Sequence, residues 1–579
     1  MKVKHFFGLA VLAAMTASCS SNDELVNNVS GNEANEGKVG YAAFSINLPT
    51  AGSMTRAADA GGAEVSEGTK EEYAVKDATA IIFQKDNTAE GGSVSYKFVE
   101  SVDLGNLLWE KDNAPGITTT ATKVAKLNKV VDDGSYYALI LLNNKTADGS
   151  NKVELPTTGT YESWNGTILE NVDFASNGIF MANAPLLSET TPATLVNIKQ
   201  GQIYTTKEAA EKATANTEIY VERGVAKVDV LAPDNLNADG TIDVKENGTG
   251  NPTGDKVKFS NWALDVTNKK TFAVHTYEGL SGSFSAIWST PRFKGTNNRI
   301  YWAQDPNYTS GNLNGVDEAS DNARKAEFNY ITKSDVDVDF GTAKYCLENT
   351  FDINDMNQGQ TTRVVFKSVY TPSGYTTDAT FYKVGKTMVK DADALKTLIN
   401  DAANAVLADC KLKDDAALLT KAGSYLLKPT DLKVGDVDLA DTETKQYNGN
   451  TQSGKEVAAA INAKLGLEGN ESTRPEDIVG INTYEKGETY YIARIKHFGD
   501  LTPWNVGDPT YNGDNAKYLG RYGVLRNNWY ELKVNSVSGL GYPDVPPVDP
   551  DMPDDENEKY ISVSVKILDW AKRSQTVDL

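Results

Sequence analysis

The sequence contains few of the residues that catalysis and metal binding require. It has three histidines, and one of them, His5, lies in an N-terminal apolar segment. His275 and His497 stand in no HExxH or other ligand spacing and are expected to be ordinary strand-edge histidines, and the chain has no Walker loop and no GxSxG elbow. Glu348 and Asp352 could form a carboxylate pair, but solvated acids at a strand end are the simpler interpretation in so acidic a chain. The sequence therefore predicts no catalytic residue, no metal site and no cofactor.

Cationic residues are too few to bind a polyanion. The 57 lysines and arginines are outnumbered by 79 aspartates and glutamates, which gives a formal net charge of −22. Proteins that bind nucleic acid or anionic membranes contact phosphates through clustered lysine and arginine. The charge balance therefore argues against nucleic acid as a partner.

Long apolar runs are rare, and the clearest one lies at the N-terminus. Lys2 and Lys4 precede Phe6–Met15, a run too short to span a bilayer, and this order is typical of a secretion signal. The run ends in TASC, which resembles a lipoprotein signal-peptidase site with Cys19 as the lipidated first residue, although threonine stands where leucine is usual. The acidic pair Asp23–Glu24 resembles the signal that sorts Bacteroidota lipoproteins to the outer face of the outer membrane.

Cysteine is scarce as well, with three in the chain. Once Cys19 is assigned to lipidation, Cys346 and Cys410 are left. They could form a disulfide in an oxidising compartment, but two buried free thiols fit the sequence equally well. Their spacing does not decide between the two.

The C-terminal residues 560–579 have the pattern of a strand that stands alone. Apolar and polar residues alternate there, as in a strand with one buried face, and the apolar ones are Ile561, Val563, Val565 and Ile567. The preceding run Pro543–Glu558 is rich in proline and acid, which predicts an extended, solvated linker. A single strand cannot bury its apolar face by itself, so this tail needs a groove in its own chain or in a neighbour.

A second strand with the same alternation lies near the N-terminus, in residues 40–49. Its apolar face would consist of Ala42, Phe44, Ile46 and Leu48. Two strands can therefore compete for one groove. The small-residue segment Thr50–Thr69 follows and contains a single basic residue, Arg56, at which a trypsin-like protease would cut.

The rest of the chain has a mainly β pattern. Short apolar runs such as Tyr136–Leu142 are separated by Gly, Asn and Asp, and Thr217–Leu231 predicts a long strand at the start of a second domain. Helical spacing of apolar residues predicts insertions at Asp391–Leu407 and Glu456–Leu467, and a short helix is expected at Thr206–Thr214. The pattern predicts β-sandwich domains with short helical insertions.

Large aromatic residues offer one further interpretation. The candidates for a sugar-stacking surface are Trp302, Tyr308, Trp504, Tyr522 and Trp529. Packing in a core or between domains is the default role of such side chains. A surface lipoprotein that binds glycans for nutrient uptake, with Cys19 retained as its anchor, is therefore the alternative hypothesis for function.

Several segments in order along the chain resemble one family, the fimbrillins that build type V pili, and in particular the shaft subunit of Bacteroidales short (minor) fimbriae. Besides the lipobox-like start, the Arg56 loop, the Pro/Asp linker and the tail ISVSVKILDW, the segments that carry the resemblance are VERGVAKVDV (221–230), YCLENTF (345–351) and RNNWYELKVNSVSGLG (526–541). The acidic loops and the insertion near Asp391 depart from the family, so loop functions do not carry over.

The resemblance implies an all-β fold of two transthyretin-like β-sandwich domains, export by the lipoprotein machinery and cleavage by an Arg-specific surface protease. Cleavage would follow Arg56, so the mature chain would begin at Ala57. The strand lost with the propeptide would leave a groove for the C-terminal strand of a neighbouring subunit. The product would be a cell-surface fimbrium, with identical subunits plus anchor and tip subunits as partners and the outer-membrane lipoprotein as precursor.

The expected division of the chain follows from these features. It is a signal peptide (1–18), a propeptide with the masking strand (19–56), an N-terminal domain (57–216), a C-terminal domain (217–542), a linker (543–559) and a donor strand (560–579). The donor side chains would be Ile561, Val563, Val565, Ile567, Leu568 and Trp570. Leu568 interrupts the alternation, which predicts a β-bulge or a kink there. The sequence does not show what the fimbria adheres to.

Overall fold

The computed structural model of the chain describes most of its residues. These are residues 38–48, 65–66, 68–86, 94–109, 120–130, 135–170, 177–188, 191–213, 216–277, 302–309, 311–313, 315–352, 355–413, 424–440, 444–447, 450–470, 478–497, 520, 522–550, 552–554 and 561–570. Strands dominate and the helices are short, so the predicted all-β fold with short helical insertions is confirmed. No helix in these ranges is long and apolar enough to cross a membrane.

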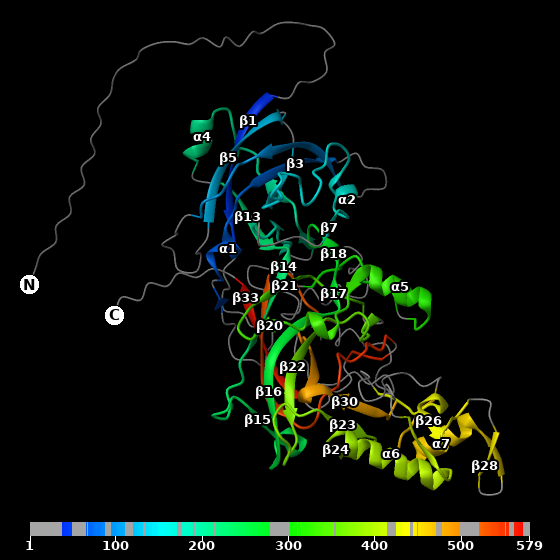
Figure 1. The fold of residues 1–579 in the computed structure, drawn as a ribbon. Coiled ribbons are helices and arrows are strands. Elements are labelled where there is room, and N and C mark those ends of the chain that lie inside the picture. Colours follow the sequence, from blue (N-terminus) through cyan, green and yellow to red (C-terminus); the bar gives the residue numbers. More distant parts are fainter. Residues whose placement is uncertain are drawn as a thin grey trace, which may run out of the picture.

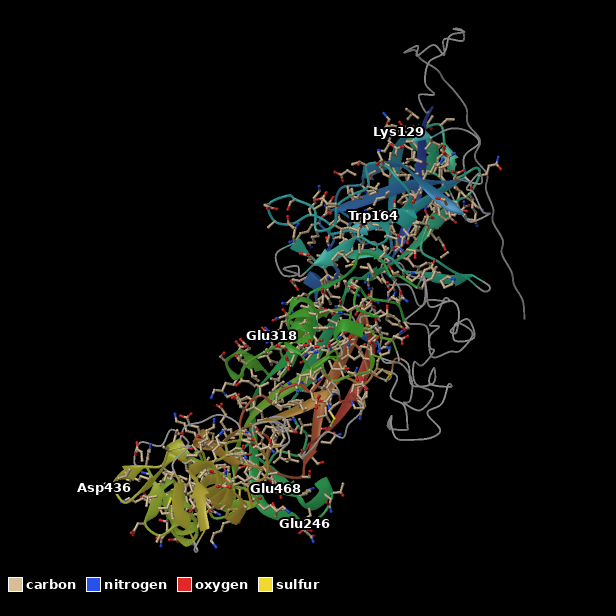
Figure 2. The ribbon with its side chains drawn as sticks, turned by 90° about the vertical axis from the view of Figure 1, so that its right-hand side faces the viewer. Lys129, Trp164, Glu246, Glu318, Asp436 and Glu468 are labelled. Atoms are coloured by element: carbon tan, nitrogen blue, oxygen red, sulfur yellow. The ribbon has the colours of Figure 1, made fainter. Side chains whose placement is uncertain are left out.

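The molecule is elongated, with three parts along its length (Figures 1 and 2). A first β-sheet region lies at one end, a second lies in the middle, and a smaller helix-containing module lies at the other end. Lys129 marks the first end and Asp436 the opposite one in Figure 2.

The N-terminal region is organised around a nine-stranded sheet with the order β12-β1-β13-β8-β6-β3-β4, in which β5 also pairs with β1 and β11 with β6. Its elements are β1 (Lys38–Asn47), α1 (Lys70–Tyr73), β3 (Ala78–Asp86), β4 (Ser95–Asp103), β5 (Thr120–Val130), β6 (Tyr136–Leu142), α2 (Tyr161–Trp164), β7 (Ile168–Glu170), β8 (Met181–Asn183), β9 (Leu186–Ser188), β10 (Thr191–Ala193), β11 (Val196–Ile198), β12 (Ile203–Tyr204), α4 (Lys207–Glu211) and β13 (Thr217–Arg223). The apolar run of β6 is buried in the middle of this sheet, as expected for a strand covered on both faces.

The C-terminal region contains a ten-stranded sheet with the order β2-β33-β32-β15-β16-β22-β31, in which β14 pairs with β21 and β32, and β20 with β16. Its elements are β2 (Val65–Ser66), β14 (Val225–Leu231), β15 (Ile242–Lys245), β16 (Pro252–Asp265), β17 (Thr267–Asn268), β18 (Lys270–Phe272), α5 (Glu318–Glu327), β19 (Phe328–Asn329), β20 (Val338–Asp339), β21 (Lys344–Leu347), β22 (Arg363–Thr371), β31 (Glu488–Arg494), β32 (Asn528–Val537) and β33 (Ile561–Trp570). Short 3-10 helices span Glu246–Gly248, Gly311–Leu313, Lys333–Asp335, Pro429–Asp431 and Glu485–Gly487.

The two sheets are joined directly by one stretch of chain. The predicted strand Thr217–Leu231 divides at Gly224 into β13, which pairs in the N-terminal sheet, and β14, which pairs in the C-terminal sheet. A Cβ atom at Gly224 would lie 3.1 Å from Phe180 Cδ1 and 3.3 Å from Leu169 Cδ2, so a larger residue would push these side chains apart. The sheets therefore meet at Gly224, seven residues beyond the boundary that we expect from the sequence pattern at 217.

The helix-containing module is an insertion between β22 and β31, which pair with each other. Its elements are β23 (Phe381–Val384), β24 (Thr387–Val389), α6 (Ala392–Val406), β25 (Cys410–Leu412), β26 (Leu432–Val434), β27 (Val437–Asp438), β28 (Thr444–Tyr447), β29 (Asn450–Ser453), α7 (Gly454–Lys464) and β30 (Ile481–Tyr484). The side chains of Asp391 and Ser453 cap α6 and α7 by accepting from the backbone N–H of Ala394 and Glu456. The module has a hydrophobic core of its own, so both predicted helical insertions belong to one small folded unit.

The two cysteines lie in different cores. Cys346 packs in the core of the C-terminal sheet and Cys410 in the core of the module, and both are free and buried. The structure therefore decides the open question in favour of two free thiols. Burial raises the pKa of the Cys346 thiol to about 12 and that of Cys410 to about 11.

These thiols should be unreactive in the folded protein. In a chain that begins after Cys19, a thiol reagent at pH 8 should label neither cysteine until denaturant is added, because burial blocks access and disfavours the thiolate. Mass spectrometry of the labelled protein measures this. Val437→Cys, at a position that is 59% exposed, is the positive control and should label at once. Rapid labelling of Cys346 in native buffer would contradict the burial.

Candidate assembly site

The N-terminal strand β1 is inserted between other strands along both of its edges. β5 pairs antiparallel with one edge over the whole strand, from Lys38 to Asn47. On the other edge, β12 pairs antiparallel with Tyr41 and Ala42, and β13 pairs parallel with Phe44–Asn47. Removal of β1 would therefore open a groove with an unpaired strand edge on each side.

The apolar face of β1 fills the core of the N-terminal region. The four residues that the sequence singles out as a masking face, Ala42, Phe44, Ile46 and Leu48, are all 0% exposed. The opposite face is largely covered as well, because Ala43 and Asn47 are buried. Asn47 Oδ1 accepts a hydrogen bond from Thr120 Oγ1 at 2.7 Å, which fixes the end of the strand against β5. β1 is thus built into the sheet as an integral strand.

The C-terminal strand β33 lies on the edge of its own C-terminal sheet. It pairs antiparallel with β32 from Ile561 opposite Val537 to Asp569 opposite Asn528. In this register the predicted donor residues Val563, Val565 and Ile567 lie opposite core residues of β32, which are Val534, Leu532 and Tyr530. The Val563 side chain packs against that core. The tail therefore has a docking place within its own chain.

The outer edge of β33 is almost open. Within the described part of the chain, β2 pairs with it over two residues, Val65 opposite Asp569 and Ser66 opposite Trp570. We call the position that a terminal strand occupies in its sheet a slot. The slot of β33 therefore has a full-length strand partner on one edge, whereas the slot of β1 has strand partners on both edges.

The predicted bulge at Leu568 is wrong. Leu568 pairs with Trp529 in unbroken register, and the register shift lies instead between Val534 and Ser536, where Asn535 is the extra residue on β32. The irregularity is on the partner strand, which the alternation of the tail by itself cannot reveal.

The interpretation of Pro543–Glu558 as a solvated linker is also corrected for the part that the structure describes. Gln358 N–H donates to the carbonyl of Met552, Arg363 Nη2 donates to that of Pro546 at 2.6 Å, and Thr361 Oγ1 donates to Asp554 Oδ2 at 3.2 Å. Asp549 and Asp554 are buried. The linker is therefore docked on the C-terminal sheet region as far as Asp554. Proline and aspartate still leave carbonyl and carboxylate oxygens free to accept hydrogen bonds.

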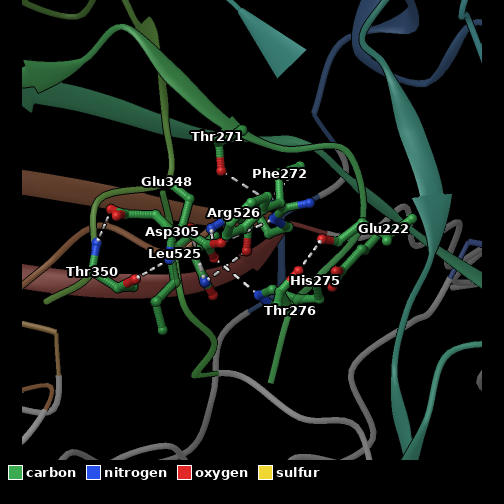
Figure 3. Close-up of polar contacts among 12 residues, drawn as sticks. Glu222, Thr271, Phe272, His275, Thr276, Asp305, Glu348, Thr350, Leu525 and Arg526 are labelled. Atoms are coloured by element: carbon green, nitrogen blue, oxygen red, sulfur yellow. Dashed lines mark hydrogen bonds and ion pairs between the residues drawn. The ribbon is translucent and has the colours of Figure 1, made fainter. Parts of the chain in front are cut away.

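A buried chain of charged side chains joins the two sheet regions (Figure 3). His275 lies between two carboxylates, with Nδ1 2.9 Å from Glu222 Oε1 and Nε2 2.9 Å from Glu348 Oε2. Arg526 Nε donates to Glu348 Oε1 at 3.2 Å, and its Nη2 donates to the carbonyl of Phe272 at 2.8 Å. None of the four charged side chains is more than 2% exposed. We call Glu222, His275, Glu348 and Arg526 the buried joint.

The buried joint connects elements that bear the two terminal strands. Glu222 lies in β13, which forms one wall of the β1 groove, and Arg526 precedes β32, on which the tail lies. A second buried ion pair lies beside it, between Lys227 Nζ on β14 and Glu72 Oε1 on α1 at 2.8 Å. Lys227 Nζ also lies 3.4 Å from the ring centroid of Trp529 on β32. The groove and the tail slot are thus fixed to the same polar cluster.

The charges of the buried joint balance when His275 is protonated. Burial alone would lower the pKa of His275, but the carboxylates of Glu222 and Glu348 raise it above its usual value. Burial alone would raise the pKa of Glu348, but Arg526 and His275 hold it below its usual range. Nearby, burial raises the pKa of Asp305 to about 7 despite hydrogen bonds from Thr350, Asn307 and Asn268.

One expectation from the sequence fails at this joint, because Glu348 is 0% exposed instead of being a solvated acid. The two histidines that were expected at strand edges, His275 and His497, are each 1% exposed. Glu222 is also buried, and it was visible in the sequence as a charge inside a strongly apolar strand, Thr217–Leu231. That interruption was the available signal for a buried ion pair.

The remaining predicted sites are placed as follows. Cys19, Arg56 and Ala57 lie outside the described residues. Among the aromatic candidates, Trp302, Tyr308 and Tyr522 are buried, and Trp504 lies outside the described residues. In the ranges that the structure covers, no group of three His, Cys, Asp or Glu side chains could hold a metal ion.

The fold and the site define a class of protein, an all-β chain whose two sheets each hold one terminal strand of that chain. Within the C-terminal region, residues 482–576 match the family model described as major fimbrial subunit protein type IV, fimbrillin, C-terminal. This match runs from β30 to beyond β33 and confirms the predicted resemblance to fimbrillins for that region. No curated protein matches the chain.

Two solved structures from Parabacteroides distasonis ATCC 8503 are similar at low level. One is a candidate cell adhesion protein, with 11% identity and a TM-score of 0.35 over 92% of this chain and 99% of that one. The other is a fimbrial assembly protein, with 11% identity and a TM-score of 0.26 over 57% of this chain and 86% of that one. At these scores neither structure establishes a shared fold.

Loss of one partner in the buried joint should be costly. Glu348→Ala leaves Arg526 and His275 incompletely paired away from water, so we expect the free energy of unfolding to fall by about 3–5 kcal/mol. Glu211→Ala removes an exposed ion pair with Lys207 and should change it by less than about 0.5 kcal/mol. Urea denaturation measures both. Equal effects in the two variants would show that the joint contributes little.

The joint should also make stability depend on pH in a defined direction. Because the pKa of His275 is raised in the folded state, its contribution is fully present below about pH 6.5 and is lost as the pH rises through the folded pKa. His275→Gln should therefore flatten the decline of the thermal midpoint above neutral pH. Asp305 is present in both proteins, so its own titration cancels in the comparison. An unchanged slope would contradict a charged His275.

Proposed function

We propose that this protein is a structural subunit of an adhesive fimbria that polymerises when its C-terminal strand enters the groove of a neighbouring subunit. The observation that carries the proposal is the difference between two slots. β1 has strand partners on both edges, whereas β33 has a full-length partner on one edge and two paired residues on the other. The fimbrillin match of residues 482–576 supports a fimbrial role.

Proteolysis after Arg56 would change the number of strands available for these slots. The precursor has two slots and two strands, because β1 and β33 each occupy one. Cleavage removes β1 with the propeptide, so the mature subunit retains β33 alone. The groove between β5 and the β12/β13 edge is then the vacant slot, and the tail of another subunit is the strand that can fill it.

Transfer of the tail to that groove is favourable because it gains a second hydrogen-bonded edge. On its own sheet, β33 pairs essentially with β32 alone. In the groove it would pair with β5 on one side and with β12 and β13 on the other, as β1 does. Each added backbone hydrogen bond contributes about 0.5–1.5 kcal/mol net. The self-docked tail is therefore a stored form and the groove is its final position.

The docked linker determines from which point of the chain the tail can swing away from β32. The described linker is held to the protein body as far as Asp554, and β33 begins at Ile561. Residues 555–560 span at most about 20 Å when extended. A tail that peels off β32 can thus pivot near Asp554 while the subunit body keeps its contacts.

The proposal includes three further steps. They are export as a lipoprotein through Cys19, processing by an Arg-specific surface protease, and association with anchor and tip subunits. The precursor would reside in the outer membrane, and the mature form in a fimbrium at the cell surface. A structural, non-enzymatic role agrees with the family match. The alternative of a glycan-binding surface lipoprotein receives no support from Trp302, Tyr308 and Tyr522, which are buried.

Processing at Arg56 is the first test. The surface form of the wild-type protein should begin at Ala57 in N-terminal sequencing, and Arg56→Ala should stay uncleaved and monomeric because β1 still fills the groove. Lys38→Ala changes another basic residue of the propeptide and should be processed normally. A wild-type surface form that retains Cys19 with its lipid would contradict the proposal and favour the permanently anchored lipoprotein.

The tail is the second test. Val563→Asp places a charge on the apolar face of β33 and should abolish the heat-sensitive ladder of multimers on gels, as should truncation before Tyr560. Ser564→Ala lies on the alternate face of the same strand, adds no charge and should leave the ladder in place. A ladder that persists after the truncation would contradict the strand-exchange mechanism.

A further inference from the structure

Departure of the tail uncovers an edge of β32 with which, among the described strands, β33 alone pairs. The opposite edge of β32 pairs with β14 over Lys227–Leu231, and its end pairs with β15 through Val537. The β33 edge, in contrast, becomes free once β33 has moved to a neighbour. This step rests on the proposed function. Because each mature subunit has two slots and one strand, every subunit within the polymer would carry one open β32 edge.

An open edge of this length is a template for pairing with another strand. Its core-facing residues Tyr530, Leu532 and Val534 are at most 1% exposed while β33 covers them. After the tail leaves, these residues lie at the rim of the core with no strand beside them on the β33 side. Both the unpaired backbone groups and the apolar rim therefore favour occupation by a new strand.

The sequence of β32 is complementary to itself when two copies run antiparallel. If Leu532 of one copy faces Leu532 of the other, Glu531 lies opposite Lys533 on both sides of that centre. In the same register Tyr530 lies opposite Val534. Opposite charges and large apolar pairs that face each other directly across two strands stabilise a sheet. A two-fold axis perpendicular to the sheet relates the copies and keeps both core faces on the same side.

The observed pairing of β32 already follows this charge rule. In the self-docked state Glu531 lies opposite Lys566 of β33. Lys533 lies opposite the neutral Ser564 and binds Asp234 instead, with Nζ 2.8 Å from Oδ1. The register shift at Asn535 limits regular pairing at one end, so the segment 530–534 is the straight part of the edge.

We propose that the vacated edge of β32 joins two fimbriae side by side through antiparallel pairing with β32 of a second copy of this chain. The interface is isologous, so each contact occurs twice. End-to-end growth uses β33 and the groove, and lateral bundling uses the edge that β33 leaves behind.

Charge exchange on the edge tests this. Glu531→Lys places Lys opposite Lys533, and Lys533→Glu places Glu opposite Glu531, so each single variant should lower the bundled fraction of processed, assembled fimbriae by about tenfold. The double variant E531K/K533E restores two opposite-charge pairs and should recover bundling. Sedimentation and negative-stain electron microscopy measure bundles, and the heat-sensitive gel ladder measures end-to-end polymerisation separately.

Control variants isolate the proposed contact. Asp234→Asn removes the existing ion pair of Lys533 without changing the edge and should leave bundling intact. Thermal midpoints of the monomers show whether any variant is misfolded, and recovery by the double variant could not arise from a folding defect alone.

Three results would overturn the inference. They are equal bundling in the single variants and the wild type, no recovery in the double variant, and single wild-type fimbriae whose β32 amides are protected from hydrogen exchange, which would show that a different strand covers the edge. Absence of a ladder in the wild type would instead refute strand exchange itself, and with it the vacated edge. The two failures are therefore distinguishable.

Discussion

The hydrogen-bonding requirement of strand edges is the constraint on which this structure depends. A backbone N–H or C=O that is buried without a partner costs as much as a lost hydrogen bond. β1 therefore sits between β5 and the β12/β13 edge, and β33 lies against β32. The chain provides hydrogen-bond partners for both terminal strands by itself, but β1 is paired along both edges and β33 along little more than one. That inequality underlies the proposed exchange between subunits, in which one strand is first removed.

The proposed strand exchange requires a rigid connection between the β1 groove and the part of the sheet that holds β33. β13 continues through Gly224 into β14, so the wall of the groove and the neighbour of β32 are one stretch of chain. The buried joint fixes the same place, because Glu222 lies in that wall and Arg526 precedes β32. Breaking one buried charge pair is expensive when its partner stays behind. The polar cluster therefore suits a subunit that has to hold two binding elements in constant relation.

The inserted helix-containing module is separate from the two terminal strands and the buried joint. It enters and leaves through β23 and β30, where the rings of Phe381 and Tyr484 stack at a centroid distance of 4.9 Å in the core of the C-terminal sheet region. Beyond these strands it has its own core, and it lies at the end of the molecule far from β1 (Figure 1). Its helices were predictable because amphipathic spacing and capping are local in sequence. Their union in one unit depends on contacts between segments far apart in the chain.

The sequence by itself determined which segments are strands and which faces of them are apolar, because side-chain alternation with period two is a local property. The two terminal strands and the β content follow from that property, and the helical insertions follow from apolar residues at helical spacing, which is equally local. Only the tertiary structure decided the slot of each strand, the register shift at Asn535 and the docking of the linker up to Asp554. It also decided the burial of Glu348, whose partners His275 and Arg526 are 73 and 178 positions away in the chain. Pairing over such distances depends on how the whole backbone folds, and no local pattern contains it.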